Sequence, residues 1–185
     1  MRQVTALVVL VMLAFASNAG AANFWFEPQV THSNGKNKLG VNGGINGNFS
    51  GPFGYYAFGQ VSSNGYRQLY AGPTWKPASW LEVGIGVGKE NMPDSTRRNA
   101  YFWVGHEGMS VFGTFENGGS GPWHKMVLNY RLNDAVGIGV MDQAFLGFGP
   151  RVEYNIKKGV QLWGAVLRDN DTNSTNAKLA VKFSF

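Results

Sequence analysis

The chain has 185 residues, of which 26 are glycine and none is cysteine, and its formal net charge is +5. Glycine is about twice as frequent as its usual ~7%, and charged residues make up 15% against a usual ~25%, which is unlike a soluble protein. The lack of cysteine excludes a disulfide framework, a cysteine zinc site and a thiol nucleophile. Beyond the N-terminal segment, no apolar run approaches the ~18 residues of a membrane-spanning helix.

Residues 1–22 have the features of a secretory signal peptide. Met1 and Arg2 give a basic start, residues 4–15 are almost wholly apolar, and residues 19–22 are small. The apolar run is too short to span the ~30 Å of a bilayer core as a membrane anchor. We predict cleavage after Ala22, which leaves residues 23–185 as one exported domain, and an exported chain without cysteine suits a Gram-negative envelope.

The rest of the chain alternates apolar and polar residues with period two, which is typical of strands that have two different faces. In the last ten residues one face holds Ala177, Leu179, Val181, Phe183 and Phe185, and the other holds Lys178, Lys182 and Ser184. The same pattern recurs at 39–46, 80–90, 125–132 and 148–156.

Turn residues divide this pattern into segments of strand length. Tight breakers at 50–52, 76–79, 107–108, 133–134 and 157–159 alternate with polar stretches at 33–37, 62–66, 91–98, 117–122 and 170–175. Between these breaks we predict twelve strands, beginning near Phe24, Lys38, Phe53, Arg67, Trp80, Asn99, Met109, Trp123, Val136, Gly147, Val160 and Asn176. Ten or eight strands are the alternatives. Pro28 makes the first strand the weakest prediction.

The whole mature length resembles a bacterial outer-membrane β-barrel, in the class of small porin-like channels. The resemblance rests on the alternating last strand, its terminal Phe185, and the alternation of short and long connections. It implies an all-β fold, a single closed antiparallel transmembrane barrel with short periplasmic turns, and Phe185 as the signal read by the barrel-assembly machinery. A soluble β-sandwich is the alternative, but its outer face should be more highly charged.

Aromatic residues gather near the predicted strand ends, where they would form girdles at the membrane interfaces. These residues are Trp25, Tyr55, Tyr56, Trp75, Trp80, Trp103, Trp123, Tyr130 and Tyr154.

If the apolar face touches lipid, the other face lines a lumen that is net basic. The predicted lumen residues are Lys125, Arg131, Arg151, Lys178 and Lys182, with Glu82 and Glu153. A basic bore attracts anions, so we predict a passive channel for small hydrophilic, preferentially anionic solutes. Inward glycines at 40, 44, 84, 86, 88, 137 and 139 favour an open lumen, although glycine also permits the sharp bending of a small, plugged barrel.

An enzyme is the main alternative function. Outer-membrane phospholipases and lipid A deacylases use a His-x-Ser arrangement, in which both side chains share one strand face. Here His32 and Ser33 are adjacent and would point to opposite faces, so the chain is not predicted to be an enzyme. A structural or adhesive barrel is a further alternative, but its loops should be longer than these.

No cofactor and no metal site are predicted. His106 and His124 have no partner at ligand spacing, and residues 169–173 lack the glycine and glutamate of a calcium loop. The expected location is the outer membrane, and the expected partners are its lipids, lipopolysaccharide near Arg97 and Arg98, and the barrel-assembly machinery. The scattered charges of an exported chain argue against nucleic acid.

Overall fold

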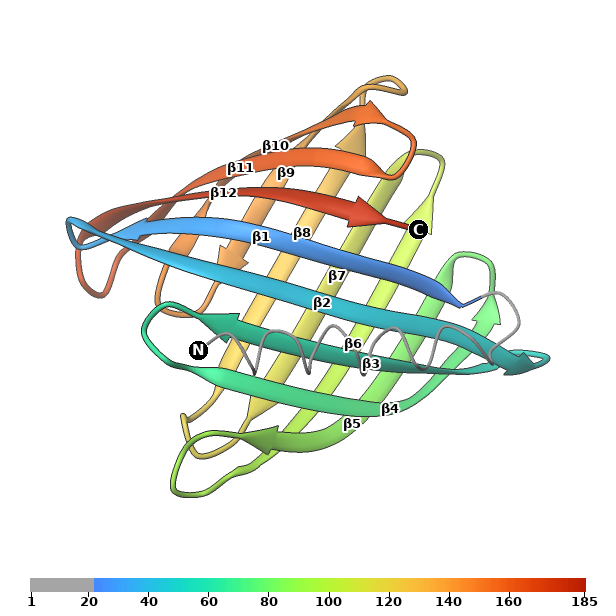
Figure 1. The fold of residues 1–185 in the computed structure, drawn as a ribbon. Coiled ribbons are helices and arrows are strands. Elements are labelled where there is room, and N and C mark those ends of the chain that lie inside the picture. Colours follow the sequence, from blue (N-terminus) through green and yellow to red (C-terminus); the bar gives the residue numbers. More distant parts are fainter. Residues whose placement is uncertain (1–21) are drawn as a thin grey trace.

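Period-two alternation and turn residues divide the chain into twelve strands, and the structure, a computed structural model, describes residues 22–185 (Figure 1). The strands are β1 (Asn23–Ser33), β2 (Lys36–Ser50), β3 (Phe53–Ser62), β4 (Arg67–Ala78), β5 (Leu81–Glu90), β6 (Thr96–His106), β7 (Met109–Asn117), β8 (Trp123–Arg131), β9 (Val136–Gln143), β10 (Gly147–Lys157), β11 (Val160–Asp169) and β12 (Ser174–Ser184). The predicted signal peptide lies almost wholly outside the described residues, and its cleavage stays a prediction. No helix within residues 22–185 is long and apolar enough to cross a membrane.

Each strand pairs with its neighbours in the chain, and β1 pairs with β12 to close the barrel. Along this seam Phe26 lies opposite Phe183, and His32 lies opposite Ala177. Backbone hydrogen bonds between Phe24 and Phe185, 3.2 and 2.8 Å long, extend the seam to the last residue. The predicted antiparallel barrel of twelve strands is therefore confirmed, and the alternatives of ten and eight are wrong.

The connections gather at two ends of the barrel. We call the end at which β1 begins and β12 finishes the turn end, and the opposite end the loop end. The turn end holds residues 51–52, 79–80, 107–108, 132–135 and 158–159, and the loop end holds residues 34–35, 63–66, 91–95, 118–122, 144–146 and 170–173.

One predicted loop is far shorter than expected. Residues 33–37 were expected to form a polar loop, but β1 runs to Ser33 and β2 begins at Lys36. Asn34 and Gly35 have φ values of 50° and 70°, as a two-residue hairpin turn requires at both positions. The Asn-Gly pair carried this signal, so the polar residues on either side belong to strands.

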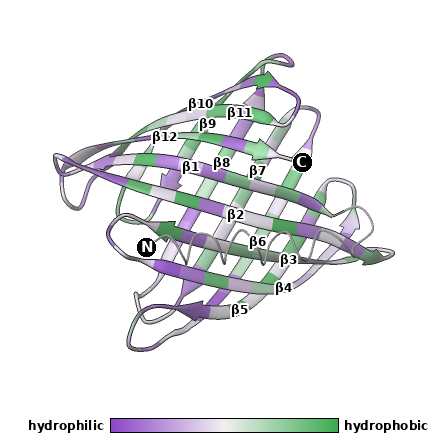
Figure 2. Ribbon diagram, in the orientation of Figure 1, coloured by the Kyte–Doolittle hydropathy of each residue, from purple (hydrophilic) through white to green (hydrophobic). Residues whose placement is uncertain are grey.

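The barrel is polar inside and apolar outside, which is the reverse of a soluble protein. Ile85 and Leu179 are 65% and 53% exposed, whereas Lys178 and Asn176 are 6% and 1% exposed. Hydrophobic and hydrophilic segments alternate along the strands (Figure 2). A continuous exposed apolar surface of this kind needs an apolar environment, such as a lipid bilayer. This arrangement excludes the soluble β-sandwich.

Part of the interior is packed with apolar side chains. Met141, Leu146, Trp163, Ala165, Leu167 and Ala180 form this cluster on the inner side of β9–β12. Leu146 belongs to the connection between β9 and β10, and Asn176 Nδ2 donates a hydrogen bond of 2.8 Å to its carbonyl oxygen. The connection is thus held against the interior, and it narrows the loop end of the lumen.

Candidate functional site in the barrel lumen

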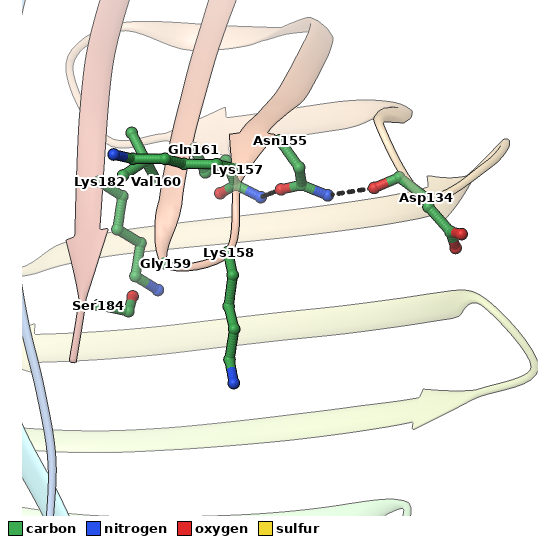
Figure 3. Close-up of a pocket in the computed structure, with 9 residues that line it drawn as sticks. All are labelled: Asp134, Asn155, Lys157, Lys158, Gly159, Val160, Gln161, Lys182 and Ser184. Carbon is green, nitrogen blue, oxygen red and sulfur yellow. Dashed lines mark hydrogen bonds between the residues drawn. The ribbon is translucent and has the colours of Figure 1, made fainter.

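The lumen contains a cavity of about 610 Å³, which inward-facing residues of every strand except β9 line. A second cavity of about 470 Å³ lies at the turn end (Figure 3). Gln161 and Lys182 line both cavities, so the mouth at the turn end leads into the lumen. The volume of the lumen cavity lies within the range of about 300–1,000 Å³ that is typical of small-molecule sites.

The turn-end mouth is basic. Lys157, Lys158 and Lys182 line it together with a single acid, Asp134. Figure 3 shows the hydrogen bonds that order its polar side: Gln161 donates to Asn155, whose amide donates to the backbone carbonyl of Asp134, each at 3.0 Å.

Inside the barrel, cations gather around one tryptophan. The Trp163 ring centroid lies 5.0 Å from Lys125 Nζ, 4.8 Å from Arg151 Cζ and 5.8 Å from Lys178 Nζ. Its Nε1 donates a hydrogen bond of 2.8 Å to the carboxylate of Glu27. We call this side of the lumen, formed by β8–β12 with β1 and β2, the basic wall. Aromatic faces stabilise cations at these distances, so the Trp163 ring stabilises three positive charges. The single carboxylate of Glu27 does not neutralise all three.

Arg151 and Lys182, both on the basic wall, differ in their partners. Arg151 Nη1 lies 2.5 Å from Glu153 Oε2, and Asn129 donates a hydrogen bond to the other oxygen of the same carboxylate. Lys182 Nζ instead lies 5.2 Å from the Trp25 ring centroid. Within the described residues, neither Lys182 nor Lys125 has a carboxylate oxygen within 4.0 Å.

The opposite side, formed by β3–β7, holds most of the lumen's acids, and we call it the acidic wall. Arg97 donates to Glu116 at 2.9 Å and to Glu90 at 3.4 Å, and all three side chains are buried. Ser120 donates both its backbone N–H and its hydroxyl to Glu90. The carboxylates of Glu90 and Glu116 therefore have their ion-pair and hydrogen-bond partners on the acidic wall itself.

Tyr66 closes this network at the loop end. Its hydroxyl lies 2.8 Å from both Glu90 Oε2 and Gln68 Oε1. Burial, opposed in part by the hydrogen bond with Ser120, raises the pKa of Tyr66 to about 12. The phenol therefore stays protonated at neutral pH and donates to the acid network.

The two walls stay separate. Within residues 22–185, no hydrogen bond or ion pair between side chains joins the basic wall to the acidic wall across the lumen. A plugged barrel would need such bonds to hold its interior charges together. The cavity thus lies between two walls, and the side-chain hydrogen bonds and ion pairs of each wall stay within that wall.

Most of the predicted lumen residues face inward. Glu82, Lys125, Arg151, Glu153 and Lys182 line the cavity, and Lys178 is buried in the basic wall. Arg131 lies opposite the inward Gly137 but is exposed at the turn end. Their role in selectivity stays a prediction.

Sequence reasoning missed several lumen charges. Glu27 follows the first strand's apolar start and precedes Pro28, so its alternation is hard to recognise. Arg97 was expected to be exposed beside Arg98, but it is 2% exposed because it faces inward and binds two acids. With Glu90 and Glu116 added, the lumen holds more acid than the sequence predicted.

Four of the predicted interface aromatics are lumen residues instead. Trp25, Tyr56, Trp103 and Trp123 line the cavity. Period two places them on the inward face of β1, β3, β6 and β8, and nearness to a strand end does not reveal the face. The other five predicted aromatics lie at the turn end of the barrel: Tyr55, Trp75, Trp80, Tyr130 and Tyr154.

The inward glycines do not simply leave empty space. A Cβ added at Gly44 would lie 2.8 Å from the ring of Trp25, and one added at Gly84 would overlap Tyr101. At Gly137 it would lie 2.8 Å from the Glu153 side chain. The glycines instead let large side chains of neighbouring strands lie along the wall.

The histidine and serine of the alternative lipid-hydrolase site do not form a catalytic pair. His32 and Ser33 are consecutive residues of β1, and the His32 ring bonds Asn37 Oδ1 at 2.8 Å. His124 has a partner that its spacing did not predict, because Asp142 Oδ2 of the neighbouring strand lies 3.0 Å from its Nε2. Within residues 22–185, no group of three or more potential metal ligands occurs.

No protein-family model matches the chain, and no curated protein matches it. Several solved structures share its fold. The KdgM porin superposes with a TM-score of 0.61 at 13% identity, over 87% of this chain and 99% of that one. The KdgM porin in complex with disordered oligogalacturonate gives 0.60 at 12% identity, over 88% and 99%. The NanC porin gives 0.55 at 9% identity, over 85% and 98%. The chain therefore has the closed barrel fold of these porins.

Proposed function

We propose that the protein is an outer-membrane channel through which small hydrophilic solutes diffuse passively, with a preference for anions. Its apolar exterior suits lipid, and its mouth at the turn end leads into a polar lumen. The oligogalacturonate of the KdgM porin complex is an acidic ligand in the same fold, which agrees with an anionic solute.

The anion preference rests on which charges have partners. The lumen carboxylates each accept a hydrogen bond from the wall: Glu27 from Trp163, Glu82 from Tyr101, Glu116 from Arg97 and Glu153 from Asn129. Lys125 and Lys182, by contrast, contact aromatic faces and have no carboxylate partner within the described residues. Unpaired cations in a confined, weakly screened lumen attract anions.

Ion selectivity in a planar bilayer tests this proposal. Under a KCl gradient, the purified protein should conduct in discrete steps, and its zero-current potential should show that chloride passes more easily than potassium. Lys182→Glu should shift that potential toward cation selectivity, because it replaces an unpaired lumen cation with an acid.

Lys89→Glu is the matched control. It makes the same charge change as Lys182→Glu, but on the outer face of β5, so it should leave the zero-current potential nearly unchanged. Silent bilayers under conditions in which a known porin conducts would refute the channel. Cation selectivity of the unaltered protein would refute the anion preference.

We also propose outer-membrane lipid as the surroundings and lipopolysaccharide as a partner. Lys89 and Arg98 are exposed near the loop end, where they suit the phosphates of an outer leaflet. Cell fractionation, with lipopolysaccharide measured in the purified protein, tests both points. Recovery in the soluble fraction would contradict them.

A further inference from the structure

The lumen cavity opens at the turn end and stops before the loop end. Tyr70, Asn99 and Trp163 line it, whereas inward residues of the same strands closer to the loop end do not. A side chain in the wall of an open pore is exposed to the water inside the pore. Near the loop end the inward side chains of both walls are instead buried, so this end of the lumen is covered: Gln68, Glu90 and Arg97 on the acidic wall, and Gln143, Leu167 and Asn176 on the basic wall.

Two inward-folded connections provide this cover. Residues 144–146 lie over the basic wall, where Leu146 is 8% exposed and packs in the apolar cluster with Trp163 and Leu167. Residues 118–122 lie over the acidic wall, where Ser120 bonds the buried Glu90. Apolar packing thus anchors the first connection, and hydrogen bonds to buried charges anchor the second.

The bonds of the second connection converge on one serine. Ser120 donates its N–H to Glu90 Oε1 at 3.0 Å and its hydroxyl to Glu90 Oε2 at 2.6 Å. Arg97 Nη1 donates to the Ser120 hydroxyl oxygen at 2.7 Å and to the Gly121 carbonyl oxygen at 3.2 Å. We call Glu90, Arg97 and Ser120 the latch, because these bonds hold the connection against the acidic wall.

The sequence of this connection allows it to move. Three of its five residues are glycine, and Gly121 has a φ of 85°, which other residues rarely adopt. A Cβ at Gly118 would overlap the Glu90 carboxylate, so only glycine lets the chain lie this close to the latch. The Gly121 N–H donates to the Gly118 carbonyl oxygen at 2.9 Å, and this turn lets residues 118–121 move as one unit.

The two connections differ in what their release would cost. Withdrawal of Leu146 would expose apolar surface to water, which is unfavourable in proportion to the area exposed. Withdrawal of residues 118–122 would exchange hydrogen bonds for bonds to water, and such an exchange has a small net cost. Arg97 would also keep its ion pair with Glu116, at 2.9 Å, so the acidic wall would stay paired. The connection at 118–122 is therefore the movable part of the cover.

We propose that residues 118–122 are a gate at the loop end of the lumen, which the latch holds closed and which opens when the bonds of Ser120 break. The inference rests on the proposed function, because a gate controls flow only through a conducting lumen. It adds a control point to that function, and it places this point on the acidic wall, apart from the unpaired cations of the basic wall.

Ser120→Ala in a planar bilayer tests the gate. The variant removes both hydroxyl bonds of the latch and leaves the Arg97 ion pairs in place. At a fixed voltage the fraction of time that the channel is open should rise about tenfold, since hydrogen bonds to charged groups are stronger than neutral ones. Ser63→Ala is the matched control: Ser63 is also in a loop-end connection, but its hydroxyl accepts from the Leu39 N–H at 3.1 Å, so the open fraction should not change.

A spin label gives a second readout that does not depend on conduction. Pro122 is exposed, and the chain has no cysteine, so Pro122→Cys provides a single labelling site within the connection. The label should show restricted motion in the otherwise unaltered protein. Adding Ser120→Ala should narrow its spectral lines, and adding Ser63→Ala should not.

The outcomes separate the gate from the channel. Conduction that Ser120→Ala leaves unchanged would refute the gate and keep the channel. An unchanged label spectrum in Ser120→Ala would show that the latch does not hold the connection, and it would overturn the inference as well. Silent bilayers from every variant would refute the proposed channel itself, and the gate with it.

Discussion

At the scale of single residues, a charge inside the barrel depends on its partners. Arg97 has a buried guanidinium between two buried carboxylates, Glu90 and Glu116, and it also donates to Ser120 at 2.7 Å. Its neighbour Arg98 is exposed on the outer face. Two adjacent arginines in the same strand therefore have opposite roles, one structural and one at the surface.

Arg97→Met should destabilise the barrel strongly, because it leaves two buried carboxylates without their cation. Removal of one partner from a buried ion pair typically costs about 3–5 kcal/mol. The free energy of unfolding in urea, measured in lipid vesicles, checks this value. Arg98→Met is the control and should change it by less than about 0.5 kcal/mol. Equal losses for the two variants would show that the buried network contributes little.

At the scale of elements, alternation and turn residues predicted the strands well. Each of the twelve predicted starts lies within three residues of the observed one, even for β1, where Pro28 weakened the prediction. The structure shows how proline is accommodated: the pairing of β1 with β12 skips Pro28, while the pairing with β2 continues through it. Pro150 of β10 likewise falls in a gap on the β11 side alone.

Alternation and turn residues could not predict which residues meet across the lumen. Period two gives the face on which a residue lies, but it does not tell which inward residues meet. Trp163 binds Glu27, which is 136 positions away in sequence, and that contact depends on closure of the barrel. The sequence alone does not show which residues of 99–107 and 160–169 face inward, because aromatic rings such as Tyr101 and Trp163 face the lumen and both faces of these strands carry bulky apolar groups.

Gly84→Ala tests how neighbouring elements fit together. The new methyl group would overlap the Tyr101 ring, which the hydrogen bond to Glu82 holds in place, so the ring must move into the lumen. We expect a loss of about 1–3 kcal/mol in stability and a smaller single-channel conductance. Gly164→Ala is the control, because its Cβ would meet its nearest neighbour at an ordinary 3.6 Å. Unchanged conductance in Gly84→Ala would mean that the ring does not shape the pore.

At the scale of the whole molecule, closure lets the barrel expose apolar residues without exposing strand edges. In lipid an unpaired backbone edge is very costly, so the β1–β12 seam is needed by all the other strands. Phe183 stacks on Phe26 at this seam, with ring centroids 4.6 Å apart. Phe185 joins it through its backbone, while its side chain is 73% exposed.

That exposure makes the proposed assembly signal separable from stability. Phe185→Ala keeps the backbone bonds to Phe24 and removes a mostly exposed ring, whose contacts with Phe26 and Phe24 are long, at 6.1 and 6.5 Å between centroids, so refolding into detergent in vitro should be close to that of the unaltered protein. In cells, where we propose that the assembly machinery reads Phe185, the amount in the outer membrane should fall several-fold. Phe183→Ala is the contrasting variant: it loses the close stacked pair with Phe26, at 4.6 Å between centroids, so it should reduce refolding in vitro as well. If Phe185→Ala reaches the outer membrane in normal amounts, Phe185 is not the signal. If it also fails to refold in detergent, its role is in the seam itself.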